Sequence, residues 1–257
     1  MAKQSVYHQT LASLADWDPY LLAESGLPGP RGNLELVQAA ADLGTPAQFR
    51  RWLALDAAAA PTNTPAEFLP VCGAVGLGRL LAAGDRAVLP ELRRHASDPR
   101  WRLREGVAMA LQHWGDADMS ALITAMKPWS RGNWLEQRAA AAALCEPRLL
   151  ANPAHTLRVL SILDTITTAL INATAVERKD PNYRVLRQAL GYCWSVAVAA
   201  APEPGKAALE KWLKQAASDP DLRWMLLENL KKNRLHRADP TWVARWQAQM
   251  LTFQSPT

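Results

Sequence analysis

The chain has 257 residues, of which 49% are hydrophobic and 21% are charged, and its net charge is +5. This apolar content is enough for a continuous core and too high for a disordered chain. The modest positive charge permits an anionic partner, but it does not by itself indicate one.

Simple inspection finds no sign of export or of membrane insertion. No uninterrupted run of about 18 apolar residues occurs, and the start, MAKQSVYHQT, lacks the apolar stretch of a signal peptide. The three cysteines, Cys72, Cys145 and Cys193, are far apart and set among apolar residues, so we expect buried, reduced thiols. These features predict a cytoplasmic protein with no membrane partner.

Apolar residues recur with helical spacing along the whole chain. In chain order the clearest segments are NLELVQAAADL (33–43), EFLPVCGAVGLGRLLAAG (67–84), LEQRAAAAALCEP (135–147), TLRVLSILDTITTALI (156–171) and ALEKWLKQAA (208–217). No segment shows the alternation of a β-strand, and short Pro, Gly and Asp turns separate the periodic segments. The sequence predicts an all-α chain of about a dozen helices.

Asp-Pro pairs mark several predicted helix starts. An Asp accepts hydrogen bonds from the free N–H groups of the first turn, and Pro suits the first helical position. The pair begins at Asp18, Asp98, Asp180, Asp219 and Asp239, and three copies continue alike as DPRWR, DPNYR and DPDLR. These three copies are 82 and 39 residues apart, about two units and one unit of a 40-residue repeat. We expect a degenerate copy near GNWLEQR and a capping helix after Asp239.

The segment SDPRWRLREGVAMAL (97–111) resembles the second helix of a HEAT repeat, in which an Asp precedes an Arg by six residues. Asp98 and Arg104 stand at those positions. The resemblance implies a right-handed α-solenoid of HEAT-like helix pairs, with these two side chains in a ladder between repeats. We expect a less regular helical section over residues 1–84 and the repeats with their capping helix over residues 85–257, in one continuous domain.

Two further segments, NWLEQRAAAAAL (133–144) and RQALGYCWSVAVAAAPEPGKAALEKWL (187–213), resemble the C-terminal repeats of the DNA alkylation repair glycosylases. That family is itself HEAT-like, and its groove of aromatic residues, an Arg and a catalytic Asp holds damaged duplex DNA. The resemblance places Arg138 at the groove Arg and Tyr192 where the family tends to have Trp.

The Trp-Trp-Asp motif of that family is missing from this chain. Its nearest counterpart is Trp101 with Glu105, four residues apart on one helical face, which leaves Glu105 as the candidate catalytic residue. No HExxH or Cys/His spacing supports a metal site, and no motif calls for a cofactor. The glycines of GAVGLGRLL (73–81) predict close helix packing. SGLPGPRGNLEL (25–36) predicts a rigid turn, either a binding element or a simple connection.

Basic residues gather in two regions. Residues 91–104 contain five Arg against two acidic residues, and residues 206–237 contain eight Lys or Arg against four. These cations either complement helix ends and repeat ladders or, beside exposed Trp side chains, form a surface for phosphates and bases. The candidate binding residues are Arg100, Trp101, Arg102, Trp134, Arg138 and Tyr192.

Two hypotheses about function follow from these patterns. The first is a non-catalytic HEAT-like repeat scaffold whose concave surface binds a protein or a nucleic acid. The alternative is an alkylpurine DNA glycosylase-like repair protein that binds duplex DNA. Only the second requires an enzyme, and no catalytic motif in the sequence favours it.

Overall fold

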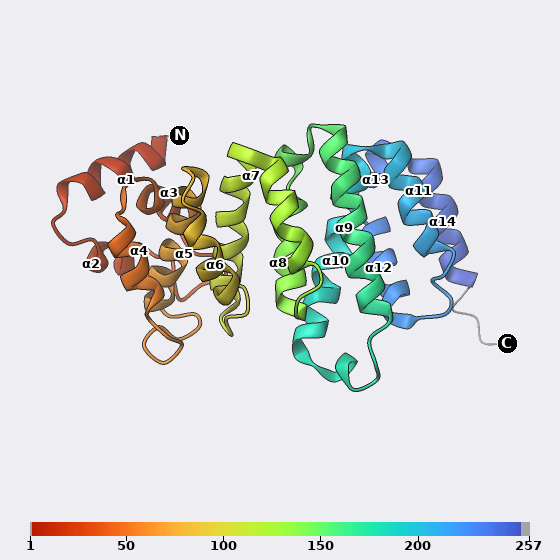
Figure 1. The fold of residues 1–257 in the computed structure, drawn as a ribbon, viewed down its shortest axis with the longest axis horizontal. Coiled ribbons are helices and arrows are strands. Elements are labelled where there is room, and N and C mark those ends of the chain that lie inside the picture. The colour runs from red at the N-terminus through yellow and green to blue at the C-terminus, as the bar shows by residue number, and fades with distance from the viewer. Residues whose placement is uncertain (1, 253–257) are drawn as a thin grey trace. The chain divides into compact units, whose positions relative to one another are not determined.

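The computed structural model describes residues 2–252, and its regular elements in that range are helices joined by loops (Figure 1). It contains 14 α-helices and four short 3-10 helices, and no strand occurs between residues 2 and 252. The predicted all-α class is therefore confirmed.

The chain divides into two compact units, Met1–Asp118 and Met119–Thr257. The division falls within α7 (Trp101–Trp129), where Asp118 has the non-helical backbone angles φ −152° and ψ 83°. The less regular helical section expected over residues 1–84 concerns how regular the helices are. The division into two compact units does not test it, so it stays a prediction. Each unit is described by itself below.

Unit 1 is built around the apolar helix α5. Its helices are α1 (Ala2–Ser13), α2 (Asp18–Ala23), α3 (Leu34–Leu43), α4 (Pro46–Leu53), η1 (Pro65–Glu67), α5 (Phe68–Ala82), η2 (Arg86–Val88), α6 (Leu89–His95) and the first part of α7. α5 packs against α2, α3, α4 and α6. Every residue from Phe68 to Gly78 is buried, so α5 supplies the centre of the core.

The glycines of α5 permit close helix packing, as predicted. A Cβ at Gly78 would lie 2.3 Å from the Cα of Ala110 in α7, and a Cβ at Gly76 would lie 2.3 Å from the ring of Phe49. Any side chain at either position would push these helices apart, because Cβ atoms do not approach other atoms so closely. The glycine-rich segment is thus explained by packing.

Unit 2 is built around α10. Its helices are the last part of α7, α8 (Trp134–Leu144), η3 (Pro147–Leu150), α9 (Pro153–Ile171), η4 (Glu177–Lys179), α10 (Pro181–Ala200), α11 (Pro202–Leu213), α12 (Pro220–Leu230), α13 (Asn233–Ala238) and α14 (Pro240–Thr252). α10 packs against α8, α9, α11, α12 and α13. The fully buried Trp194 of α10 donates its indole N–H to Thr167 Oγ1 of α9 at 3.0 Å, which satisfies a polar group that burial would otherwise leave unpaired.

All five Asp-Pro pairs lie at helix starts, and at four of them the Asp carboxylate accepts a hydrogen bond from the backbone. Asp98, Asp180 and Asp219 each accept a hydrogen bond from the backbone N–H two residues later, at 2.8, 2.8 and 2.9 Å. Asp239 accepts from the N–H of Trp242 at 2.9 Å, at the start of α14. These contacts satisfy donors that the first helical turn leaves free, and they confirm the predicted helix starts.

Two related positions complete the set. Asn133 caps α8 by accepting from the N–H groups of Leu135 and Glu136 at 3.0 and 2.9 Å, so a capped helix begins in the segment where the degenerate copy is expected. Asp18 differs, because it is the first residue of α2 and its carboxylate binds the side chains of Arg51 and Trp52 instead of backbone.

Two helical segments, Pro65–Ala82 and Pro153–Ile171, are long and apolar enough to cross a membrane by length and composition. Neither is an uninterrupted apolar run, since Glu67 and Arg79 interrupt the first and Arg158 and Asp164 the second. Within the first segment 72% of the residues are buried inside the chain, so its position in the core of unit 1 accounts for its composition.

The three thiols are buried and unbridged, as expected. Burial raises the pKa of Cys72 well above its ordinary value. Burial, together with a hydrogen bond that the Cys145 thiol donates to the neighbouring Cys193, raises the pKa of Cys145. Neutral thiols of this kind are poor nucleophiles, so the cysteines serve as small core residues.

Candidate functional site

The candidate residues fall into two groups, one in each unit. Arg100, Trp101, Arg102 and Glu105 lie at the start of α7 in unit 1. Trp134, Arg138 and Tyr192 lie on α8 and α10 in unit 2.

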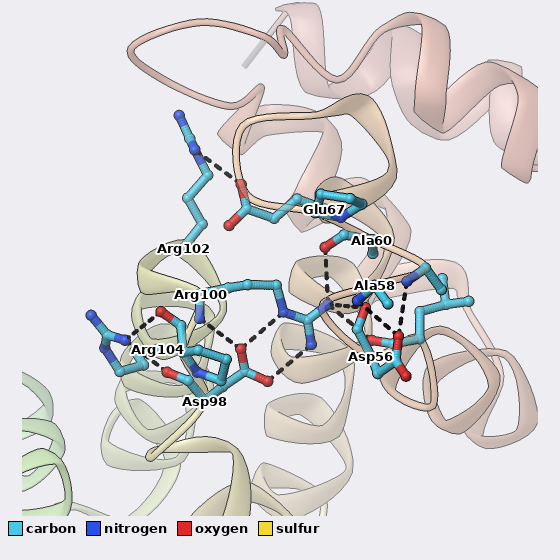
Figure 2. Close-up of polar contacts among 12 residues, drawn as sticks. Asp56, Ala58, Ala60, Glu67, Asp98, Arg100, Arg102 and Arg104 are labelled. Carbon is cyan, nitrogen blue, oxygen red and sulfur yellow. Dashed lines mark hydrogen bonds and ion pairs between the residues drawn. The ribbon is translucent and has the colours of Figure 1, made fainter.

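The buried side chain of Arg100 links the start of α7 to the loop of residues 55–60 in unit 1, and this set of contacts is called the Arg100 clip below (Figure 2). Its side chain is 2% exposed, and its Nε and Nη2 donate to the two carboxylate oxygens of Asp98, both at 2.9 Å. Its Nη1 donates to the backbone carbonyls of Leu55, Asp56 and Ala60 at 2.9, 3.1 and 3.3 Å. The guanidinium is therefore occupied inside the unit, and it presents almost no charge to solvent.

Burial acts to raise the pKa of Asp98, but hydrogen bonds from the side chain and backbone of Arg100 outweigh burial and hold this pKa below its ordinary value. Arg104 does not reach the carboxylate of Asp98. Its Nη1 donates instead to the backbone carbonyls of Asp98 and Pro99 at 2.7 and 3.0 Å (Figure 2). Asp98 and Arg104 thus meet through a backbone oxygen and not through the Asp98 carboxylate.

Arg102 is the second internal guanidinium. Its Nη1 donates to Oε2 of the fully buried Glu67 at 3.0 Å, and its Nη2 donates to the carbonyl of Gly29 at 2.6 Å and to Asn63 Oδ1 at 3.1 Å. The N–H of Gly29 also donates to Asn63 Oδ1, at 3.1 Å. These bonds anchor the Gly-Pro turn of residues 25–33 to α7. Glu67 Oε1 and Arg102 Nε are buried without a hydrogen-bond partner.

Trp101 has the opposite environment. Its side chain is 44% exposed, and the Cζ of Arg102 lies 4.4 Å from the centroid of its rings. Glu105, one helical turn further along α7, is also exposed. All eleven tryptophans lie in the described part of the chain, and the other ten are buried or half-buried.

In unit 2 the expected residues form two local clusters. Trp134 packs edge-on against Tyr183, with ring centroids 5.5 Å apart, and Arg138 follows one turn later on α8; both are half-buried. Tyr192 is 42% exposed, and Arg234 of α13 donates to its hydroxyl at 2.5 Å with its Cζ 4.4 Å from the ring centroid. Lys232 Nζ lies 5.9 Å from the same ring.

A second cation–aromatic stack in unit 2 has no counterpart in the sequence analysis. The Cζ of Arg187 lies 4.4 Å from the ring centroid of Trp224, and Arg187 Nη1 forms an ion pair with Asp221. The residues come from α10 and α12 and are more than 30 positions apart in sequence, so no local pattern links them. Unit 2 thus has an arginine–aromatic pair at Tyr192 and another at Trp224. Both involve α10, which packs against α12 and α13.

The net charge of the chain hides an uneven distribution. Unit 2 contains 18 Lys and Arg against 11 Asp and Glu, a net charge of +7, whereas unit 1 contains 11 against 13, a net charge of −2. Three further cations of unit 2 are exposed. Lys231 and Arg237 are close in sequence to Lys232 and Arg234, and Arg184 lies on α10, the helix that also contains Tyr192. The excess of positive charge in this protein therefore lies in unit 2.

No protein-family model matches the chain, and comparison with curated proteins and with solved structures finds no match. Among residues 2–252, no group of three or more His, Cys, Asp or Glu side chains is placed to hold a metal ion.

Proposed function

We propose that the protein is a non-catalytic binding scaffold and that its partner is a nucleic acid held by unit 2. The observation that carries this proposal is the concentration of positive charge in unit 2, +7 against −2 in unit 1, beside cation–aromatic pairs at Tyr192 and Trp224. Lys and Arg provide affinity by neutralising phosphates, and aromatic rings add contacts with bases or sugars.

A HEAT-like arrangement within unit 2 would suit this role. α10 contacts both α8 and α12, and α9 contacts α11, as expected for two layers of paired helices. The Asp-Pro starts of α10 and α12 and the Asn133 start of α8 supply the repeated element. We extend this to a right-handed α-solenoid, whose concave face presents one long surface to a polymeric partner.

A nucleic acid is favoured over a protein partner by the sign and density of the charge. A protein interface usually has few charges at its centre, whereas a nucleic-acid interface is strongly positive. We further propose a cytoplasmic location, in keeping with three thiols that remain unbridged.

The enzymatic alternative is a DNA glycosylase-like repair protein that uses Glu105. One observation favours it: Glu105 and Trp101 are both exposed and lie one turn apart on α7. This alternative predicts release of a base from alkylated duplex DNA and loss of that release in Glu105→Gln. If Glu105→Gln still releases the base, Glu105 is not the catalytic residue. If the wild-type protein releases no base, the glycosylase alternative is wrong and the scaffold proposal remains.

The first experiment is a fluorescence anisotropy titration of labelled 20-nucleotide strands and 20-base-pair duplexes at low and moderate salt. We expect micromolar or tighter binding whose logarithm falls linearly with the logarithm of salt concentration, by about 0.7 to 0.9 for each phosphate contacted. Flat titrations at low salt for both forms would overturn the proposal and direct the search to protein partners.

A further inference from the structure

Trp101 is the one exposed tryptophan among the eleven, all of which lie in the described part of the chain, and its relative exposure is 44%. An indole buries more apolar surface than any other side chain, so leaving one in water gives up a stabilising contribution that the other ten tryptophans make. The position of Trp101 is nevertheless well defined. Trp101 is the first residue of α7 and follows Arg100, whose backbone N–H donates to Asp98 Oδ1 at 2.8 Å.

The guanidinium of Arg102 packs against the ring of Trp101, and hydrogen bonds fix the position of this guanidinium. Arg102 lies 4.4 Å from the indole centroid, and Glu67, Gly29 and Asn63 hold its guanidinium from three directions. This ion pair is buried and leaves Glu67 Oε1 and Arg102 Nε without partners. A buried pair with unsatisfied atoms adds little to stability compared with apolar residues of the same size. The structural effect of the Glu67–Arg102 pair is to position the turn of residues 25–33 and the guanidinium that packs against the indole of Trp101.

We propose that Trp101 is a stacking platform for an unpaired nucleobase. This inference rests on the proposed nucleic-acid binding and adds to it a base-contacting position in unit 1. The charge of Arg102 is already compensated by Glu67 and that of Arg100 by Asp98, so the two guanidiniums next to Trp101 in sequence are not available to a phosphate. A guanidinium already lies against the indole and disfavours a second cation on the ring. A flat, neutral ring remains the favoured occupant, and bases stack on aromatic side chains regardless of their sequence.

The test compares two labelled single strands of 20 nucleotides at one salt concentration. One strand carries thymine throughout, and the other has abasic sites in its central ten positions, so the phosphates are the same and only the bases differ. Wild-type protein should bind the thymine strand at least about tenfold more tightly than the abasic strand. Trp101→Leu, which keeps an apolar side chain but loses the ring, should bind the thymine strand about tenfold more weakly than the wild-type protein does, as expected for the loss of one stacked base, and should bind the abasic strand with unchanged affinity. Trp101→Phe should retain most of the preference.

Each remaining outcome distinguishes the two proposals. Equal binding of both strands by the wild-type protein, or an unchanged preference in Trp101→Leu, would overturn the platform while leaving phosphate binding by unit 2 intact. Salt-independent or absent binding of both strands would overturn the proposed function, and the platform with it. Because Trp101 is exposed, both variants should show the wild-type circular dichroism spectrum and melting temperature within about 2 °C.

Discussion

The side-chain amide of Asn229 on α12 is hydrogen-bonded to the backbone of α10 through Ser195. Asn229 Oδ1 accepts from the N–H of Ser195 at 2.8 Å, while its Nδ2 donates to the carbonyls of Leu190 and Met225, both at 2.8 Å. Asn229 and Ser195 are fully buried. One side chain therefore satisfies backbone groups of two helices at the centre of unit 2, where water cannot replace it.

We expect Asn229→Ala to lower the free energy of unfolding by about 3 kcal/mol, because it leaves buried backbone groups of α10 unpaired and also opens a small cavity. Urea denaturation followed by circular dichroism measures this loss. Asn233→Ala, at an exposed position at the start of α13, is the matched control and should change stability by less than about 0.5 kcal/mol. Equal losses in both variants would contradict the role given to Asn229.

The second prediction concerns the Arg100 clip. Arg100→Ala removes the partner of Asp98 and the donor to three backbone carbonyls, so we expect a loss of about 3–5 kcal/mol in unfolding free energy. Asp98→Ala removes both the helix cap and the anchor of Arg100, and it should cost more than the ~1 kcal/mol of a cap alone. Arg31→Ala, at an exposed arginine of the same unit, is the control. An Arg100→Ala protein as stable as this control would show that the clip is dispensable.

The third prediction is a pH dependence of stability that originates at His95. Burial and the positive charge of Arg94 lower the pKa of His95 below its ordinary value of 6.5. The unfolded chain then binds more protons than the folded chain below pH 6.5, so stability falls as the pH drops from 6.5 through the folded-state pKa. His95→Gln should flatten the stability profile between about pH 6.5 and 5.

The matched control for His95 is His236→Gln, since His236 is exposed on α13. Melting temperatures of both variants and of the wild-type protein, recorded from pH 5 to 8, provide the comparison. A decline below pH 6.5 that persists unchanged in His95→Gln would assign the pH dependence to other groups.

The fourth prediction uses tryptophan fluorescence to test the exposure of Trp101. Acrylamide reaches exposed indoles more readily than buried ones, so Trp101→Phe should remove the most strongly quenched part of the emission. Trp224→Phe, at a half-buried ring covered by Arg187, is the control and should reduce total emission with little change in the quenchable fraction. The same Stern–Volmer slope in both variants would contradict the exposure of Trp101.

The fifth prediction concerns the basic surface of unit 2. A Lys232→Ala, Arg234→Ala double variant removes two cations beside Tyr192 and should reduce the salt dependence of nucleic-acid binding by about one to two units of slope. An Arg31→Ala, Arg50→Ala double variant removes the same charge from exposed positions of unit 1. Equal effects of the two double variants would show that binding responds to total charge and not to this surface.

The helices and most of their starting points could be predicted from the sequence by itself. The reason is that helical periodicity and N-caps are local: Asp98, Asp180 and Asp219 cap backbone groups only two or three residues later. The packing use of the α5 glycines followed from the same pattern, since small residues on a buried helix face permit close approach.

Which arginines and aromatic rings face solvent was decided only by the tertiary structure. Arg100, Trp101 and Arg102 are consecutive, yet the first and last are buried against residues up to 73 positions away while Trp101 is exposed. Arg234 meets Tyr192 across 42 positions. Residues 100° apart around a helix point to different neighbours, and only the packing of distant segments determines which direction is core and which is solvent.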